Sequence, residues 1–325
     1  MRLLLTHTPL ARATYYGARP LELLRGLVDL RLHEADAPLS PDGLIAAARE
    51  VDLVIADRAT PVPGAVFAGL PALRALMRTA VDIRNIDVEA ASAAGVLVTH
   101  AEPGFVEAVV ELALGFLVDL SRGISRAVSD YHDGRTPEIR MGRQLSGAAV
   151  GIIGYGRIAR HLAPVLAAMG VTVLVSDPYA QVDDPRFIKL PMDDLLARAD
   201  YVVCLAVATE ETENLLDAAA FARMRRDAFF INLSRGNLVD EAALAAALTE
   251  GRIAGAAMDV GRAPDQMPSP GLARLPNVIA TPHIGGLTPS AAESQAMDTV
   301  RQVQAILKGE VPPGAVNAGT WHRRP

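Results

Sequence analysis

Cysteine is nearly absent from this sequence: its 325 residues include one, Cys204. A single cysteine cannot form an internal disulfide, and it excludes a thiolate metal cluster, so no metal site is predicted. Cys204 lies in the apolar run Tyr201–Leu205, where a small buried side chain is its expected role.

Long apolar runs are also missing, since no stretch reaches the roughly 18 apolar residues that a membrane-spanning helix needs. The first residues, Met1 to Thr6, have the pattern of a strand rather than of a cleavable signal.

Lysine occurs only at positions 189 and 308, the arginines are scattered, and the net charge is -6. Nucleic-acid binders usually cluster their basic residues, so neither a nucleic acid nor a membrane is an expected partner. With no disulfide possible, a cytoplasmic location is predicted.

Short apolar runs alternate with helical patterns along most of the chain, which is typical of parallel βαβ units. A helix expected over Asp42–Glu50 is preceded by Ser40 and Pro41, a common cap and first-turn pair. The first series of candidate strands comprises Arg2–Leu5, Val28–Leu32, Leu53–Ala56, Leu73–Met77 and Val96–Thr99.

A long helix is predicted from about Val106 to Asp130, followed by a polar stretch from Tyr131 to Gly147. That stretch is either a solvated linker or an arm that packs on a second subunit. The second series of candidate strands comprises Ala149–Ile153, Val171–Ser176, Tyr201–Leu205, Phe229–Asn232, Ile253–Asp259 and Val278–Ala280. A final helix over Pro289–Lys308 is expected to return and cover the first domain.

A glycine-rich segment follows the first strand of the second series. It reads Gly154-Tyr155-Gly156-Arg157-Ile158-Ala159, the Gly-x-Gly-x-x-Ala form of a dinucleotide-binding turn. The first glycine permits a tight turn, the second lets the backbone approach a pyrophosphate, and the helix start that follows offers free N–H groups. The next strand ends in Asp177, which can hold a ribose 2′-hydroxyl and would repel a 2′-phosphate. The pattern therefore predicts NAD; the alternative for Asp177 is a turn residue before Pro178.

Polar residues follow three further strands of this series. Arg235 comes after a buried strand, where a guanidinium is costly unless it meets an anion such as a carboxylate. His283 follows Thr281-Pro282 and can both take and return a proton near neutral pH. Asp259 ends the strand between them, and parallel strands share the edge where such residues meet. Each residue alone has an ordinary structural explanation, but together they predict a catalytic group.

These segments resemble the D-2-hydroxyacid dehydrogenase family over nearly the whole chain, most densely from Gly151 to Gly286. The resemblance implies that Arg235 binds the carboxylate and carbonyl oxygen of the substrate and that His283 is the catalytic acid/base. It also implies that Asp259 contacts the nicotinamide carboxamide, and that a homodimer forms around the long helix and the arm. The implied cofactor-binding residues are Gly154, Tyr155, Gly156, Arg157, Ile158, Asp177, Asp259, Gly285 and Gly286.

The predicted fold class is α/β with two doubly wound parallel-sheet domains. A Rossmann-type NAD-binding domain over residues 101–286 is inserted into a flavodoxin-like substrate-binding domain over residues 1–100 and 287–325. Because the chain crosses between the domains twice, a cleft is expected between them.

One departure from the family concerns the partner of His283. Family members usually carry an acid five residues after the position of Asp259, and it hydrogen-bonds the catalytic histidine, but this chain has Pro264 there. A neighbouring carboxylate favours the protonated imidazole, so its loss is expected to leave His283 more often neutral at pH 7. Asp265 is the predicted replacement. Gln266 is the alternative, because formate-oxidising members of the family pair a glutamine with the histidine.

A second departure lies in the loop that holds the substrate carboxylate in the family. Here the predicted substrate-binding residues are Ala80, Val81 and Asp82, with alanine and aspartate where glycines are common. The N–H of Val81 remains a candidate donor, whereas Asp82 would repel a carboxylate unless Arg78 or Arg84 offsets it. The alternative is a solvated loop whose charges pair with each other.

The sequence therefore predicts reversible hydride transfer between NAD(H) and C2 of a small 2-hydroxy or 2-keto acid. His100, just after the strand Val96–Thr99, either touches that substrate or has a structural role. Two alternatives stay open: formate or another small anion as the donor on the same fold, and an NAD(H)-binding sensor similar to related corepressors.

Overall fold

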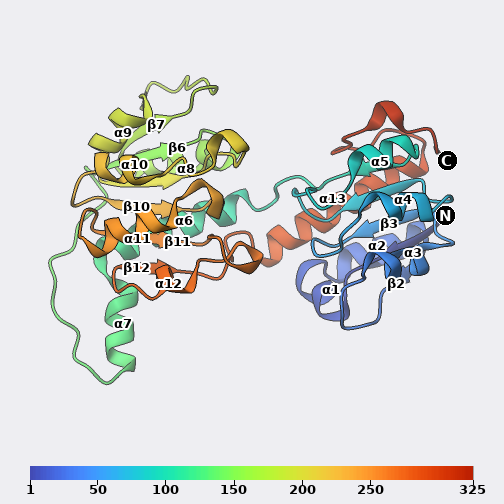
Figure 1. Cartoon of the computed structure of the whole chain (residues 1–325), viewed down its shortest axis with the longest axis horizontal. Coiled ribbons are helices and arrows are strands. Elements are labelled where there is room, and N and C mark those ends of the chain that lie inside the picture. Colours follow the sequence, from blue (N-terminus) through green and yellow to red (C-terminus); the bar gives the residue numbers. More distant parts are fainter. Residues whose placement is uncertain (325) are drawn as a thin grey trace. The chain divides into compact units, whose positions relative to one another are not determined.

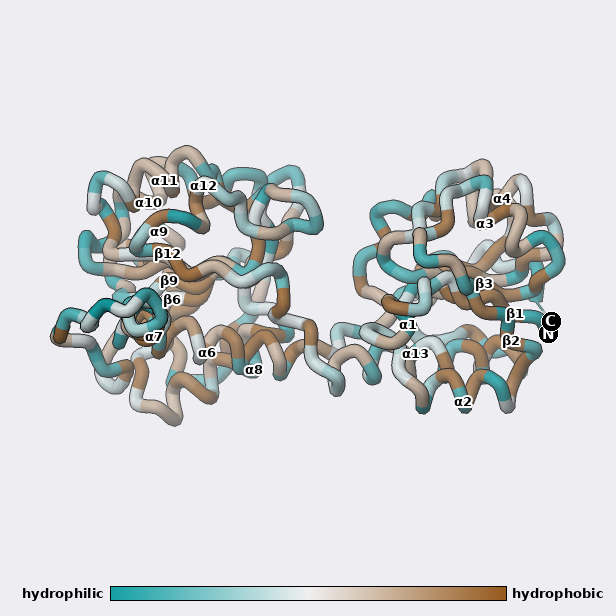
Figure 2. The backbone as a smooth tube through the Cα atoms, turned by 90° about the horizontal axis from the view of Figure 1, so that it is seen from below, coloured by the Kyte–Doolittle hydropathy of each residue, from teal (hydrophilic) through white to brown (hydrophobic). Residues whose placement is uncertain are grey.

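The computed structural model describes residues 1–324 and divides into two compact units (Figure 1). Unit 1 comprises Met1–Phe105 and Thr288–Pro325, and unit 2 comprises Val106–Leu287. Both units are α/β structures built on parallel sheets, which confirms the predicted fold class. Figure 2 draws the apolar strands of each unit in brown, between more hydrophilic helices and loops.

Within residues 1–324, the sheet of unit 1 has five parallel strands in the order β2-β1-β3-β4-β5, the flavodoxin-like arrangement. The strands are β1 (Arg2–Leu5), β2 (Asp29–Leu32), β3 (Leu53–Ala56), β4 (Ala75–Arg78) and β5 (Leu97–Thr99). The helices are α1 (Pro9–Tyr15), α2 (Ala18–Leu27), α3 (Pro41–Ala48), α4 (Gly64–Gly69), α5 (Val88–Ala93) and α13 (Pro289–Leu307). Because β3 is buried along its whole length, it is a continuous apolar run in the sequence.

Local side-chain caps account for where two helices of unit 1 begin. The Ser40 hydroxyl accepts a hydrogen bond from the N–H of Gly43 at 3.1 Å, so the serine caps α3 as predicted. The Thr288 hydroxyl accepts one from the N–H of Ala291 at 3.2 Å at the start of α13. Since α13 packs against α1, α2 and β4, the last helix shares a core with the first strands of the chain.

In the described part of unit 2, the sheet has seven parallel strands in the order β12-β11-β10-β9-β6-β7-β8, a Rossmann-type order extended by one strand. The strands are β6 (Ala149–Ile153), β7 (Thr172–Ser176), β8 (Phe187–Lys189), β9 (Tyr201–Cys204), β10 (Phe229–Asn232), β11 (Gly255–Met258) and β12 (Val278–Ala280). The α-helices are α6 (Val106–Arg122), α7 (Ile124–His132), α8 (Arg157–Ala168), α9 (Met192–Arg198), α10 (Ala218–Arg223), α11 (Glu241–Thr249) and α12 (Pro270–Ala273). Short 3-10 helices occur at Glu210–Thr212, Gly236–Leu238 and Pro264–Gln266 in this unit and at Ala318–Thr320 in unit 1.

The prediction of one long helix over Val106–Asp130 is wrong. Gly123 has a φ of 67°, a left-handed conformation that ends α6 and lets α7 start in a new direction. Strand β8 was not predicted, because it is short and two of its residues are exposed, so it has no apolar run. Several other predicted strands differ from the observed bounds by one or two residues, as for β4 and β11.

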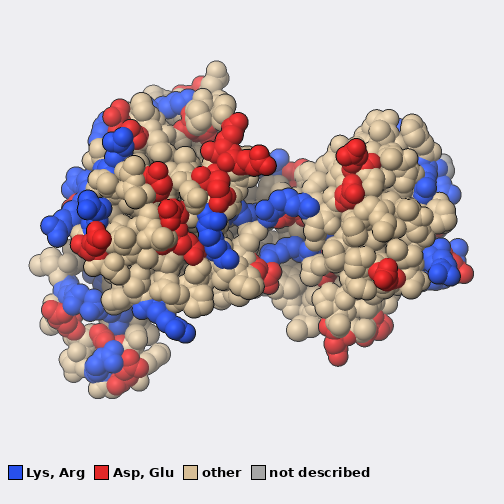
Figure 3. Space-filling view, viewed as in Figure 1, with Lys and Arg blue, Asp and Glu red and all other residues tan. Residues whose placement is uncertain are grey.

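Charged side chains of both signs lie on the surface of the protein. Among residues 1–324, no helix combines the length and the apolar composition that crossing a bilayer requires. On the face drawn in Figure 3, basic and acidic side chains intermix over unit 2. Many of them form surface ion pairs, such as Arg186 with Asp184 at 2.6 Å.

Candidate active site

The glycine-rich turn follows β6, at the point where the strand order changes direction between β6 and β9. Gly154 has a φ of 89°, and a Cβ there would lie 2.5 Å from the Cα of Ala206, so a side chain does not fit. Gly156 is different, because a Cβ at this position would meet no atom within 4 Å. The backbone of Gly156 is therefore open to a ligand, which fits the close approach of a pyrophosphate.

Helix α8 begins directly after this turn. Ala159 is fully buried, and its small side chain lets the helix pack closely on the sheet. Gly156 and Arg157 are exposed, so the first turn of α8 presents its backbone N–H groups at the surface. These groups and the positive end of the helix dipole suit the phosphates of a dinucleotide.

The Asp177 carboxylate connects the glycine-rich turn to the end of β7. Its Oδ2 accepts a hydrogen bond from the N–H of Tyr155 at 2.7 Å. Its Oδ1 accepts from the N–H groups of Tyr179 at 2.9 Å and Ala180 at 2.8 Å. Burial acts to raise the pKa of Asp177, but these backbone donors outweigh it and hold the pKa below its ordinary value. Asp177 is thus an ionised turn residue, and a carboxylate has further lone pairs with which to accept a ribose hydroxyl.

The ring of Tyr155 belongs to the interior of unit 2. It is 5% exposed, packs edge-on against Phe187 at 6.4 Å, and lies 4.6 Å from the Arg160 guanidinium. The part of Tyr155 that faces the turn is therefore its backbone N–H, which Asp177 already binds.

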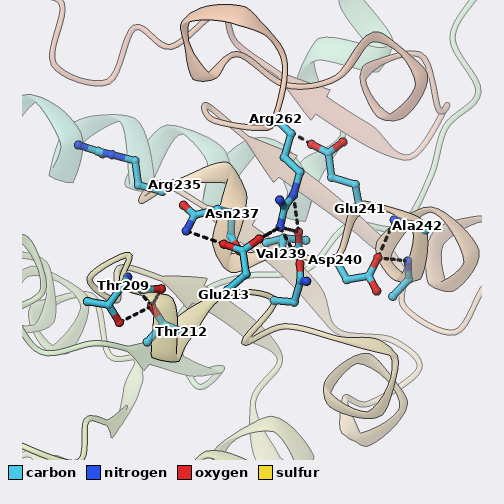
Figure 4. A network of polar contacts seen from close by, with 12 residues as sticks. Thr209, Thr212, Glu213, Arg235, Asn237, Val239, Asp240, Glu241, Ala242 and Arg262 are labelled. Atoms are coloured by element: carbon cyan, nitrogen blue, oxygen red, sulfur yellow. Dashed lines mark hydrogen bonds and ion pairs between the residues drawn. The ribbon is translucent and has the colours of Figure 1, made fainter. Parts of the chain in front are cut away.

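Arg235 lies on the turn after β10, and Asn232 shapes that turn. The Asn232 amide donates to the carbonyl of Arg235 at 3.0 Å and accepts from the N–H of Ser234 at 3.1 Å. The Ser234 hydroxyl donates to the carbonyl of Ala206 at 2.5 Å, which joins this turn to the loop after β9. The Arg235 side chain is half-buried and contacts the Ser234 carbonyl at 2.7 Å. Figure 4 shows it extending away from the neighbouring polar network.

Arg262 is the centre of that network (Figure 4). Its guanidinium donates to Glu213 Oε1 at 2.8 Å. It also donates to the main-chain carbonyls of Asn237 at 3.0 Å and Val239 at 3.1 Å, which belong to the segment after Arg235. One side chain from the loop after β11 thus holds the loop after β10.

The same two loops touch directly at a pair of glycines. A Cβ on Gly236 would lie 2.1 Å from the carbonyl carbon and oxygen of Gly261, so no side chain fits there. Glu241 adds a further connection, because its carboxylate accepts from the N–H of Arg262 at 2.9 Å and from the Ser269 hydroxyl at 2.6 Å. The loop that carries Arg235 is therefore fixed against the loop after β11.

Asp259 positions the turn that carries His283. Asp259 is 2% exposed. It accepts hydrogen bonds from the Thr281 hydroxyl at 2.6 Å, the N–H of Ile284 at 2.8 Å and the N–H of Gly285 at 2.7 Å. These partners flank His283 on both sides. The predicted contact of Asp259 with the nicotinamide carboxamide remains a prediction.

His283 itself is held in a conformation that L-residues rarely adopt. Its φ is 55°, in the left-handed region, where non-glycine residues concentrate at functional sites. The ring nitrogen Nδ1 lies 2.8 Å from the main-chain carbonyl oxygen of Asp265. Gln266, the alternative partner, has a buried Oε1 that accepts no hydrogen bond within the described chain.

Strand order brings the catalytic candidates to one edge of the sheet. Arg235, Asp259 and His283 follow β10, β11 and β12, which are neighbours and parallel. The glycine-rich turn follows β6 at the same edge, because β6 and β10 are both paired in parallel with β9. One edge of unit 2 therefore holds a guanidinium, an imidazole and a glycine-rich turn with an open backbone.

The predicted substrate loop of unit 1 carries a self-paired charge. The Arg84 guanidinium binds both carboxylate oxygens of Asp82, with a shortest distance of 2.6 Å. The hydrogen bonds to Asp82 raise the pKa of Arg84. Arg84 therefore offsets the charge of Asp82. The neighbouring residue Val81 is 37% exposed.

The charge of Asp82 also acts on Arg78, whose hydrogen bonds are made to other groups. Arg78 is fully buried and donates to the carbonyls of Asp57 and Thr60 and, at 2.7 Å, to the Asn85 side chain. Burial lowers its pKa to about 10. His100 directs Nδ1 to its neighbour Ala101, whose carbonyl lies at 2.9 Å, which is compatible with the structural role considered for it.

Several positioning residues could not be identified from the sequence. Arg262 and Glu213 are 49 residues apart, and nothing in either segment marks them as partners. Asn232 and Gly236 stand beside Arg235 in the motif, so their proximity to it was visible, but their contacts to distant backbone were not.

Comparison with protein families gives one match that covers over half of the chain. The matching family is described as "D-isomer specific 2-hydroxyacid dehydrogenase, NAD binding domain", and the match covers residues 114–285. This range contains the glycine-rich turn, Asp177, Arg235 and His283.

Two curated relatives illustrate the similarity. D-3-phosphoglycerate dehydrogenase of Mycobacterium tuberculosis is 37% identical over 282 residues, 86% of this chain and 53% of that protein. The chain thus spans about half the length of the phosphoglycerate dehydrogenases that it matches. Glyoxylate reductase of Thermofilum pendens is 31% identical over 315 residues, 94% of this chain and 93% of that protein.

Among solved structures, D-2-hydroxyisocaproate dehydrogenase has the same fold, with a TM-score of 0.87. The similarity covers 98% of this chain and 100% of that one at 23% sequence identity.

Proposed function

Because the chain belongs to the D-isomer specific 2-hydroxyacid dehydrogenase family, we propose that it transfers a hydride reversibly between NAD(H) and C2 of a small 2-hydroxy or 2-keto acid. NAD is the cofactor of the family's nucleotide-binding domain, which covers residues 114–285. The observation that carries the proposal is the placement of Arg235 and His283 after neighbouring strands, on the edge that bears the glycine-rich turn.

Each residue has a defined task in this proposal. Arg235 binds the substrate carboxylate with its planar fork and stabilises charge that develops on the substrate oxygen. His283 takes the hydroxyl proton during oxidation and returns it to the carbonyl oxygen during reduction. The Asp259 carboxylate keeps the His283 turn in place by accepting hydrogen bonds from the N–H groups of Ile284 and Gly285. NAD, when bound, accepts or supplies the hydride.

The cofactor contacts are proposed from the same turn. Gly156, Arg157 and Ile158 are assigned to the phosphates, since they form the open start of α8. Asp177 is assigned to a ribose hydroxyl, and Gly285 and Gly286 to the nicotinamide side. The assignment of Ala80, Val81 and Asp82 to substrate binding rests on the family resemblance.

A homodimer is part of the proposal. Helix α7 and the segment after it extend from the body of unit 2 (Figure 1) and expose large apolar side chains: Tyr131 is 69% exposed, and Ile139 and Met141 are 100% exposed. Exposed apolar groups on such a segment are typical of a surface that a partner covers. Sedimentation of the protein, compared with an Ile139→Asp/Met141→Asp variant, tests this; a monomeric parent protein would contradict it. A cytoplasmic location stays a prediction.

The test of the activity is NADH oxidation with a panel of 2-keto acids, from glyoxylate and hydroxypyruvate to bulky aryl acids. His283→Ala is expected to lower kcat by about 100- to 10,000-fold, the usual contribution of a general acid. Arg235→Lys keeps the charge but loses the fork, so it should raise KM for the acid.

Controls separate the alternatives. NADH should raise the melting temperature of the parent protein and of His283→Ala alike, because the imidazole is not assigned to cofactor binding. No reduction of any acid, with NADH still stabilising the fold, would refute the dehydrogenase and favour the NAD(H) sensor. Formate-dependent NAD reduction in the same assay would instead favour the small-anion alternative.

A further inference from the structure

The ring of His283 has a hydrogen-bond partner where the family's usual acid is missing. Pro264 occupies the position of that acid, and the nearest partner of Nδ1 is the main-chain carbonyl oxygen of Asp265, at 2.8 Å. We infer that this main-chain carbonyl, rather than a carboxylate, orients the catalytic imidazole. The inference rests on the proposed function and names a positioning residue for it.

A carbonyl partner determines which ring nitrogen exchanges the substrate proton. A carbonyl oxygen can accept a hydrogen bond but cannot donate one, so Nδ1 of the neutral ring must carry the hydrogen. Nε2 then keeps its lone pair and is the nitrogen that can act as the base. The contact therefore selects one tautomer, and it does so without adding a charge beside the ring.

The carbonyl is aimed by an unusual backbone conformation. Asp265 has a φ of 58° and a ψ of 20°, and Gln266 also has a φ of 58°. Two successive non-glycine residues in the left-handed region are rare and need support from their surroundings. Pro264 precedes them with its restricted φ, so the turn has little freedom to open.

Backbone hydrogen bonds close this loop on itself. The N–H of Gly261 donates to the carbonyl of Gln266 at 2.8 Å, and the N–H of Ala263 donates to that of Met267 at 3.1 Å. The N–H of Met267 donates to the carbonyl of Pro264 at 3.2 Å. The carbonyl of Asp265 stays outside this ladder and is the one that meets His283.

Arg262 anchors the closed loop to the rest of unit 2. Its guanidinium binds Glu213 and the backbone after Arg235, and its N–H binds the Glu241 carboxylate at 2.9 Å. The loop therefore places Arg235 and the partner of His283 relative to each other. Asp259 holds the His283 turn from the other side, so the imidazole is fixed through its backbone and through Nδ1.

Two substitutions at one position distinguish a carbonyl from a carboxylate. Asp265→Asn and Asp265→Val both remove the acid, but asparagine tolerates the left-handed conformation and β-branched valine does not. With the carbonyl as partner, valine should lower kcat about tenfold more than asparagine does, with a smaller effect on KM. The pH profile of kcat/KM for the asparagine variant should stay within about half a unit of the parent's.

Equal losses in the two variants, or a shift of that profile by a unit or more with asparagine, would overturn the inference. Circular dichroism of the valine variant checks that it is folded.

The tautomer is measured separately by NMR of protein labelled with ¹⁵N-histidine, with His283→Gln to identify the resonances of this ring. We expect a protonated Nδ1 and an unprotonated Nε2 in the neutral ring of the parent protein and of Asp265→Asn. The opposite tautomer would refute the inference whatever the kinetics are. If no 2-keto acid is reduced, the proposed function fails, while this measurement still decides how the ring is held.

Discussion

Lowering the pH from 7 to 5 should destabilise unit 1 through a buried histidine outside the candidate site. His7 is 2% exposed, lies edge-on to the Tyr16 ring at 5.2 Å, and has its Nε2 3.2 Å from the Thr79 hydroxyl. Burial lowers the pKa of His7 from 6.5 to about 4. The nearby Arg78 lowers it further, and Asp57 partly opposes both.

The sign and size of the effect follow from proton linkage. The unfolded chain takes up a proton at His7 below pH 6.5, while the folded protein stays neutral there until about pH 4. Stability is therefore complete above pH 6.5 and is lost as the pH falls toward 4. This difference corresponds to about 3 kcal/mol in total and about 2 kcal/mol between pH 7 and pH 5.

The chain contains a natural probe for this measurement. Trp321 is its one tryptophan, is 2% exposed, and belongs to the same core cluster as Tyr16. Urea unfolding followed by tryptophan fluorescence therefore reports on unit 1 specifically. The free energy of unfolding should fall between pH 7 and pH 5 by about 2 kcal/mol more in the parent protein than in His7→Leu.

The leucine variant keeps the Thr79 hydroxyl bonded, because that group also donates to the Ala56 carbonyl at 3.0 Å. His132→Leu, which changes an exposed histidine of unit 2, is the control and should keep the pH dependence of the parent. If His7→Leu lost as much stability as the parent over this interval, the linkage argument would be refuted.

Three further predictions concern the loops of unit 2. Gly236→Ala places a Cβ 2.1 Å from the Gly261 carbonyl, so it should displace Arg235 and lower kcat/KM about 100-fold. Gly271→Ala, whose Cβ meets no atom within 4 Å, is the control and should not lower kcat/KM; equal kcat/KM values in the two variants would contradict the prediction. Gly154→Ala, at a φ of 89° and 2.5 Å from Ala206, should weaken NADH binding about tenfold or more in a fluorescence titration, and an unchanged Kd would show that the turn adapts. Asp177→Asn keeps an acceptor for the turn but removes the charge, so the ratio of the Kd values for NADPH and NADH should fall about tenfold; a constant ratio would argue against the ribose assignment.

Much of the fold could be predicted because its determinants are local. Strands β1, β3, β6 and β10 were predicted with their observed bounds, since largely buried parallel strands are apolar runs flanked by turn residues. Strand β12 is less buried, but its three apolar residues also predicted its observed bounds. The cap of α3 was also visible, because a serine and the N–H it binds are three residues apart. The error at Gly123 has a local cause as well: a single glycine inside an apolar periodic pattern does not reveal whether it will adopt a positive φ.

The sequence alone was sufficient for the family, the fold class and NAD, because these depend on residue types at short spacings: the glycine-rich turn, the acid that ends the next strand, and the Arg235 and His283 motifs. Only the tertiary structure decided what surrounds those motifs. That Arg78 is fully buried, that Arg262 reaches Glu213, and that the Asp265 carbonyl meets His283 all depend on segments far apart in the chain. The left-handed conformations of Asp265, Gln266 and His283 were also decided by the tertiary structure, since no residue type there demands a positive φ. They exist because many distant contacts together outweigh a local backbone preference, and a sequence pattern records only the preference.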